Sequence, residues 1–122
     1  MNITLWLIQA VLAATFLVSG TAKSTLSRER LVASGQTGVA VFPRPVVRVT
    51  AVAELLGVLG ITLPWATGVA RVLTPLAAVG FAAVMVGAVT AHVRLREVRN
   101  TLATSLLFLL SVTVAVARFA QL

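Results

Sequence analysis

Four long apolar runs, separated by short polar segments, dominate the chain. They cover residues 3–22, 46–63, 69–93 and 101–120. About 20 helical residues, each rising about 1.5 Å, cross the ~30 Å hydrocarbon core of a bilayer. The pattern therefore predicts an all-α protein, an integral membrane four-helix bundle that forms a single domain over residues 1–122. We see neither an internal repeat nor a second domain.

The first run has a rival interpretation as a secretory signal peptide. Gly20 and Ala22 are small residues of the kind that precede a cleavage site. Residues 1–5, however, contain no Lys or Arg that would form the basic start of such a signal. We therefore interpret the run as the first membrane helix.

The polar connections set the expected helix ends. Residues 24–44 form the longest one, and its SRERL motif at residues 27–31 fits either a short helix in the headgroup layer or a solvated loop. Pro45 suits the first turn of the second helix, and Pro64 is expected to end it. The short turn at residues 64–68 makes the second and third helices antiparallel neighbours. Residues 94–100 form a charged turn before the last helix.

Composition supports a membrane protein and narrows its chemistry. Hydrophobic residues make up 59% of the chain and charged residues 11%, with ten Lys and Arg against three Glu. The cations lie in short segments rather than along one helix face, which favours lipid phosphates and excludes nucleic acid as the expected partner. The chain has no cysteine and one histidine, so we expect no metal site of its own. Electrons in any redox reaction would pass through a cofactor or a partner.

Charge asymmetry predicts the orientation. The connections at residues 24–44 and 94–100, with their adjoining helix ends, carry eight of the ten cations, whereas the opposite side carries Arg71 and Arg118. By the positive-inside rule the two charged connections are cytoplasmic and both termini lie outside. The expected location is the inner (plasma) membrane of the cell, as a multi-pass protein.

Glu54 is the one carboxylate within an apolar run. An ionised carboxylate deep in hydrocarbon costs several kcal/mol, so it normally faces other helices, where it finds a partner or carries a proton. The positions three and four residues away hold no cation. A counter-ion must therefore come from another helix.

Several polar side chains are candidates to share a site with Glu54. Lys23 and His92 start near the same membrane face, but Glu54 lies roughly 13 Å along its helix from Pro45. A direct bond between Lys23 and Glu54 stays open but would be strained by this difference in depth, so a water-filled pocket between them is the favoured arrangement. The candidates for ligand binding or proton exchange are Glu54, Lys23, His92 and Ser19, followed by Arg118, Gln9 and Thr50; no catalytic residue is identified.

Structural interpretations of the same residues stay open. Glu54 would then only fix helix packing, Lys23 and Arg118 would be anchors that extend to the membrane surface, and His92 would be a hydrogen-bonded structural group. Neither interpretation is excluded by the sequence.

Four segments resemble the DoxX-like family of four-helix membrane proteins. They are SGTAK at residues 19–23, FPRPVVRVTAVAELLGVLGITLP at 42–64, LTPLAAVGFAAVMVGAVTAH at 73–92, and ARF at 117–119. The resemblance implies the same four-helix architecture. Some relatives are named as the membrane subunit of a thiosulfate:quinone oxidoreductase, and others are associated with membrane redox complexes or with receptor assembly. By this resemblance, the expected site positions are Ser19, Lys23, Glu54, His92 and Arg118.

The resulting expectation is an accessory or quinone-facing subunit of a membrane redox complex. Its ligand would be a quinone or a lipid, held without a covalent bond. The expected partners are membrane lipid, a redox protein and a second copy of the chain. The alternatives are a non-enzymatic assembly factor or scaffold that binds partner helices and, third, a proton-coupled carrier of a small solute. Whether the protein is an enzyme stays open.

Overall fold

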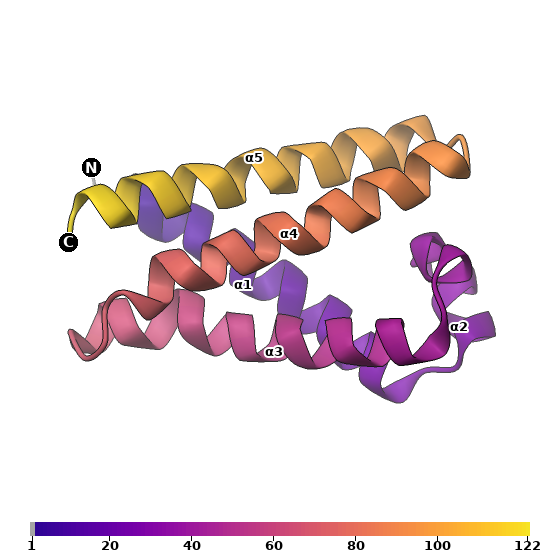
Figure 1. The fold of residues 1–122 in the computed structure, drawn as a ribbon, viewed down its shortest axis with the longest axis horizontal. Coiled ribbons are helices and arrows are strands. Elements are labelled where there is room, and N and C mark those ends of the chain that lie inside the picture. Colours follow the sequence, from indigo (N-terminus) through magenta and orange to yellow (C-terminus); the bar gives the residue numbers. More distant parts are fainter. Residues whose placement is uncertain (1) are drawn as a thin grey trace.

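The fold is an all-helical bundle (Figure 1). The computed structural model describes residues 2–122, and no strand occurs within them. The elements are α1 (Asn2–Thr25), α2 (Arg28–Ala33), the 3-10 turn η1 (Thr37–Val41), α3 (Arg44–Thr67), α4 (Leu73–Arg94) and α5 (Val98–Ala120). Among these, α1, α3, α4 and α5 are long and apolar enough to span a membrane. The predicted four-helix membrane architecture is confirmed.

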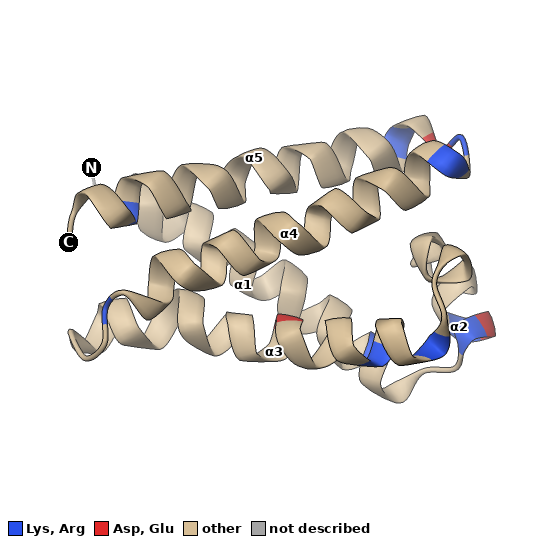
Figure 2. Ribbon diagram, viewed as in Figure 1, with Lys and Arg blue, Asp and Glu red and all other residues tan. Residues whose placement is uncertain are grey.

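The two ends of the bundle differ in polarity. Both termini lie at one end, here called the terminal end, whereas α2, η1 and the α4–α5 turn lie at the other (Figure 1). Figure 2 shows most Lys, Arg and Glu residues gathered at this second end, called the charged end. Leucine and valine side chains are exposed along all four long helices, as expected for surfaces that face lipid.

The helices pack in the order α1, α3, α4, α5. Contacts are extensive between α1 and α3, α3 and α4, and α4 and α5, but sparse between α1 and α5. At the centre the rings of Phe16 and Phe81 stack with their centroids 4.0 Å apart. Leu12, Ile61 and Val114 surround them and are completely buried. Because α1 and α5 meet only in part, the bundle leaves space between them.

Pro64 does not end the second spanning helix, and this part of the prediction is wrong. α3 continues through Pro64 to Thr67, so the turn to α4 lies at residues 68–72. Proline has no N–H, which leaves the carbonyl four residues earlier without its helical donor. The hydroxyl of Thr74 on α4 donates to this carbonyl, that of Gly60, at 2.8 Å. A neighbouring helix thus satisfies the group that the proline leaves unpaired.

The long polar connection folds onto the charged end. Its SRERL motif forms α2, and the Ser27 side chain accepts a hydrogen bond from the Arg30 N–H at 3.3 Å. Leu31 is buried against Val39 and Val47. The helical interpretation of this segment is therefore correct, and its apolar contacts anchor residues 26–43 against the start of α3.

Candidate functional site

Glu54 forms a direct ion pair inside the bundle. Its carboxylate is fully buried, and Oε1 lies 2.8 Å from Nζ of Lys23 on α1. The hydroxyl of Ser19 lies 3.2 Å from Oε1 and 3.1 Å from Oε2. Ser19 and Lys23 are four residues apart and therefore share one face of α1. The counter-ion comes from another helix, as the sequence required.

The expectation of a water-filled pocket between Lys23 and Glu54 is wrong. Helical side chains tilt toward the N-terminus of their own helix. Lys23 therefore reaches from the charged end back into the bundle. Glu54, on the antiparallel α3, reaches toward the charged end. Because the side chains of Lys23 and Glu54 point toward each other, they meet although their backbone positions lie at different depths.

Gly20 allows α1 and α3 to approach closely at this point. A Cβ at this position would lie 2.9 Å from Cγ of Leu55 and 3.2 Å from the carbonyl oxygen of Ala51. A side chain there would push the helices apart. The glycine between Ser19 and Lys23 thus sets the helix separation that the ion pair requires.

Gln36 connects the pair to the folded connection. Its Nε2 donates to the Ser19 hydroxyl oxygen at 3.0 Å. Sequence reasoning missed Gln36, because nothing in the polar connection showed which of its residues would turn back over the bundle. The hydrogen bond places the amide side chain of Gln36 next to the Ser19–Glu54 contact.

His92 belongs to a second cluster and forms no bond with Glu54. Its Nδ1 lies 2.8 Å from Oε1 of Glu97 and must donate, because an ionised carboxylate only accepts. The Thr37 hydroxyl donates to the same oxygen at 2.6 Å, and Nδ2 of Asn100 lies 3.3 Å away. Glu97, Thr37 and Asn100 were also missed. The one available signal was that Glu97 is among only three acids in the chain.

The end of α4 directs Glu97 back toward His92. Arg96 has φ 57°, in the left-handed region, and its N–H donates to the Val93 carbonyl. The Glu97 N–H donates to the His92 carbonyl, which completes the hydrogen-bonding pattern of a Schellman helix end. This local turn brings the Glu97 carboxylate against the last turn of α4.

The contact of Glu97 with Thr37 and His92 is sensitive to acid. The Thr37 hydroxyl, and after it the His92 imidazole, hold the pKa of the Glu97 carboxyl below its ordinary value. A lowered pKa in the folded state adds stability that is complete above the ordinary glutamate range, about pH 4–5. That stability is lost as the pH falls further, through the pKa of the folded state.

We therefore expect η1 to loosen in acid. The chain has no cysteine, so Ala40→Cys, an exposed position in η1, carries a single spin label. The label should gain mobility as the pH falls from 7 to below about 4. Glu97→Gln should remove most of this change. A label whose mobility is unaffected by pH in the parent protein would contradict the assignment.

Two cavities lie beside the ion pair. The first, called the chamber, has a volume of about 390 Å³ between η1, α3 and α4. The second, called the cleft, has a volume of about 520 Å³ between α1, α4 and α5. Lys23, Gln36, Ala88 and His92 line both cavities. The wall between chamber and cleft therefore carries three polar side chains from three separate segments.

The other candidates fall into different places. Ser19 lines the cleft and Thr50 lines the chamber, although the Thr50 hydroxyl donates to its own helix at Val46. Glu54 lines neither cavity, because Lys23 and Ser19 cover its carboxylate. Lys23, and not Glu54, is therefore the member of the ion pair that faces the two cavities.

Gln9 and Arg118 meet at the opposite, terminal end. Nε2 of Gln9 donates to the Ile61 carbonyl at 2.6 Å, and Nε of Arg118 donates to Oε1 of Gln9 at 2.8 Å. Arg118 is completely buried. The interpretation of Arg118 as an anchor that extends to the surface is wrong, because the side chain turns inward to bond with Gln9.

These features define a multi-pass membrane bundle with a buried ion pair beside two cavities. Comparison with known protein families matches residues 7–115 to the DoxX-like family. The chain belongs to the DoxX-like family, as the resemblance of its motifs indicated. Comparisons with curated proteins and with solved structures gave no significant match.

Proposed function

We propose that the protein binds the head group of a quinone in the chamber, as an accessory or quinone-facing subunit of a membrane redox complex. The observation that carries the proposal is the placement of Lys23. Its ammonium group is held by Glu54 at 2.8 Å and lines the chamber together with Gln36 and His92. Small-molecule sites are mostly apolar cavities of about 300–1,000 Å³ with a few convergent polar groups, and the chamber fits this description.

The polar groups suit a carbonyl-bearing head group. The ammonium of Lys23 and the amide of Gln36 are hydrogen-bond donors. With Nδ1 of His92 engaged by Glu97, its Nε2 is the ring nitrogen left to face the chamber, near Gly38. Quinone oxygens accept hydrogen bonds from Lys23 and Gln36. Because Nδ1 of neutral His92 donates to Glu97, its Nε2 is an acceptor and suits the hydroxyl group of the reduced head group. Reduction adds protons to these oxygens, and a lysine and a histidine are side chains able to exchange them.

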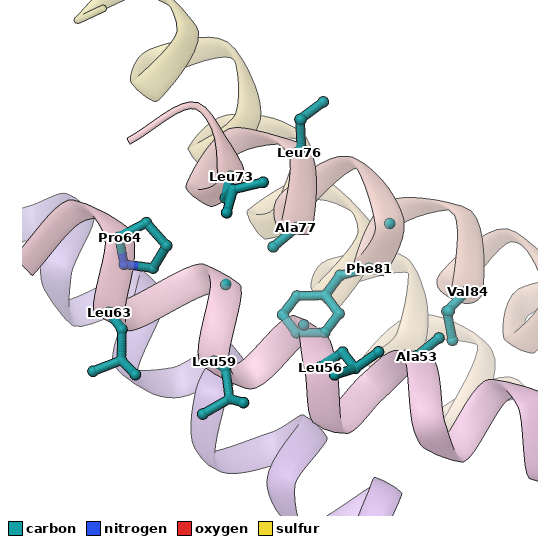
Figure 3. A pocket seen from close by; sticks show the side chains of 13 residues that line it. Ala53, Leu56, Leu59, Leu63, Pro64, Leu73, Leu76, Ala77, Phe81 and Val84 are labelled. Carbon is teal, nitrogen blue, oxygen red and sulfur yellow. The ribbon is translucent and has the colours of Figure 1, made fainter. Parts of the chain in front are cut away.

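An apolar groove next to the chamber supports a ligand with a tail. This α3–α4 groove has a volume of about 540 Å³ and is lined by thirteen residues without a charged or hydrogen-bonding side chain, including Leu63 and Leu73 near the terminal end (Figure 3). It shares Ala53 and Val84 with the chamber. A head group in the chamber would therefore place its tail along the groove, facing lipid.

Quinone binding to purified protein tests the proposal. A decyl-quinone and a tailless benzoquinone are titrated in nanodiscs by equilibrium partition. We expect Lys23→Gln to weaken both ligands about tenfold or more, since a hydrogen bond from a charged group contributes about 1.5–3 kcal/mol. Ala53→Phe, at the junction with the groove, should weaken only the decyl-quinone. Arg94→Gln, an exposed cation at the same end, is the matched control. Unsaturable binding, or equal affinities for parent and Lys23→Gln, would reject the proposal.

The charge asymmetry supports a cytoplasmic location for the charged end in an inner membrane. With this orientation the chamber opens near the cytoplasmic face, and both termini lie outside. The chain has no cysteine, so electrons reaching a bound quinone come from a partner protein or its cofactor. We also propose a second copy of the chain as a partner.

A scaffold role is the second candidate. The observation that favours it is that the Glu54 carboxylate bonds only to side chains of α1 and lines neither cavity. The pair would then only fasten α1 to α3. In that case a double substitution of Lys23 and Glu54 by apolar residues would preserve assembly with a partner, and quinone binding would be absent from the parent protein as well.

A further inference from the structure

At the terminal end, two arginine side chains lie against the indole ring of Trp65. The guanidinium carbon of Arg118 lies 4.4 Å from the centre of the Trp65 ring and 5.6 Å from that of Trp6. The guanidinium carbon of Arg71, in the α3–α4 turn, lies 4.1 Å from the centre of Trp65. Ala70 has φ 52°, a left-handed conformation that is strained for a non-glycine residue. A strained turn thus holds a second cation against the indole that Arg118 already contacts.

No glutamate side chain lies near the positive charge at this end. All three acids of the chain are far from it: Glu29 and Glu97 lie at the charged end, and Glu54 lies eleven residues before Trp65, about 16 Å along α3 (Figure 2). The aromatic faces supply cation–π attraction, but they carry no net negative charge. Two cations therefore share one indole, and neither Arg71 nor Arg118 forms an ion pair within residues 2–122.

Arg118 is also incompletely hydrogen-bonded. Its Nε donates to Gln9 and its Nη1 donates to Oε1 of Gln121 at 2.6 Å. Both acceptors are neutral amides. Its Nη2 is buried and has no hydrogen-bond partner within the part of the chain that the structure describes. Buried charges are normally paired with an opposite charge, because burial without one is costly.

We infer that the terminal end binds a phosphate-type oxyanion at Arg71 and Arg118, and that the phosphate of an anionic lipid head group is its source. Arg71 is exposed and makes the direct contact. Arg118, fixed behind it by Gln9 and Gln121, adds charge from the protein interior. Tryptophans concentrate at the level of lipid head groups, so Trp6 and Trp65 place both arginines at the depth of the phosphates. This site is separate from the chamber, which lies near the charged end.

Intrinsic fluorescence tests the inference directly. Trp6 and Trp65 are the two tryptophans of the chain, and both lie over Arg118, so their emission reports on this site. Detergent-solubilised protein is titrated with short-chain phosphatidylglycerol, with short-chain phosphatidylcholine and with inorganic phosphate. We expect a saturable change with phosphatidylglycerol, at concentrations at least tenfold below those needed for phosphatidylcholine. Saturation by inorganic phosphate with equal affinity would retain the oxyanion site but replace the lipid as its source.

Substitutions connect the signal to the arginines. Arg71→Gln should weaken phosphatidylglycerol binding about tenfold, with Arg71→Lys intermediate. Arg94→Gln removes the same charge from an exposed position at the opposite end and should leave the affinity unchanged. Arg71 is exposed, so its variants are expected to stay folded, which circular dichroism verifies. No saturable change with either anion, or equal weakening by Arg71→Gln and Arg94→Gln, would overturn the inference.

Discussion

Lys23→Met is expected to destabilise the bundle by about 3–5 kcal/mol, because it leaves the fully buried carboxylate of Glu54 without its counter-ion. Glu54→Gln should cost less, about 1–2 kcal/mol. The amide still accepts a hydrogen bond from Ser19, and the ammonium of Lys23 faces two cavities. Unfolding in mixed micelles, driven by an anionic detergent, measures both free energies.

A double substitution provides the control for this prediction. Lys23→Met combined with Glu54→Leu removes both charges and should recover most of the stability lost in Lys23→Met, since apolar replacements of a buried pair are often neutral. With Glu54→Leu measured alone as the second single variant, the double-mutant cycle gives a coupling energy of about 2 kcal/mol or more. Additive effects of the two substitutions would show that the ion pair contributes nothing to stability.

Gly57→Ala is expected to destabilise the protein by about 1–3 kcal/mol, the usual cost of overpacking. A Cβ at Gly57 would overlap the ring of Phe81. That ring cannot move aside, because it is buried and stacks on Phe16 with an interplanar angle of 8°. The same mixed-micelle unfolding experiment measures the loss.

Gly80→Ala is the matched comparison for Gly57→Ala. Both glycines lie in spanning helices and line the α3–α4 groove, but a Cβ at Gly80 meets no atom within 4 Å. Alanine has the higher helix propensity, so Gly80→Ala should be neutral or stabilise by up to about 1 kcal/mol. Equal losses from the two substitutions would mean that Phe81 does not set the separation of α3 and α4.

The sequence supported the buried location of Glu54 but not its contacts. The acid shares a helix face with Gly57 and Ile61, and the 3.6-residue period suffices to predict that this face points inward. Which side chain pairs with Glu54 depends on the relative position of α1 and α3 along the bundle axis. Gly20 and the opposed tilt of the two side chains decided that, and neither is visible in the periodicity of a single helix.

The same limit explains the other corrections. Pro64 is a helix breaker by local rules, but Thr74 of a neighbouring helix satisfies the carbonyl that it leaves free. His92 bonds to Glu97 because the turn at Arg96 folds back, and Arg118 turns inward because Gln9 lies within reach. The outcomes at Pro64 and Arg118 depend on contacts between helices that are distant in sequence. The outcome at His92 depends on a turn that reverses the direction of the chain.

The amino-acid sequence alone determined that four helices span a membrane, that Glu54 lies on a buried face, and which family the chain resembles. These properties follow from the length and period of apolar runs, and both are local. The tertiary structure decided which polar groups meet, which cavities they line, and that Glu54 lies behind Lys23. Hydrogen bonds and ion pairs require atoms within about 3 Å, so they depend on the relative shift and separation of whole helices.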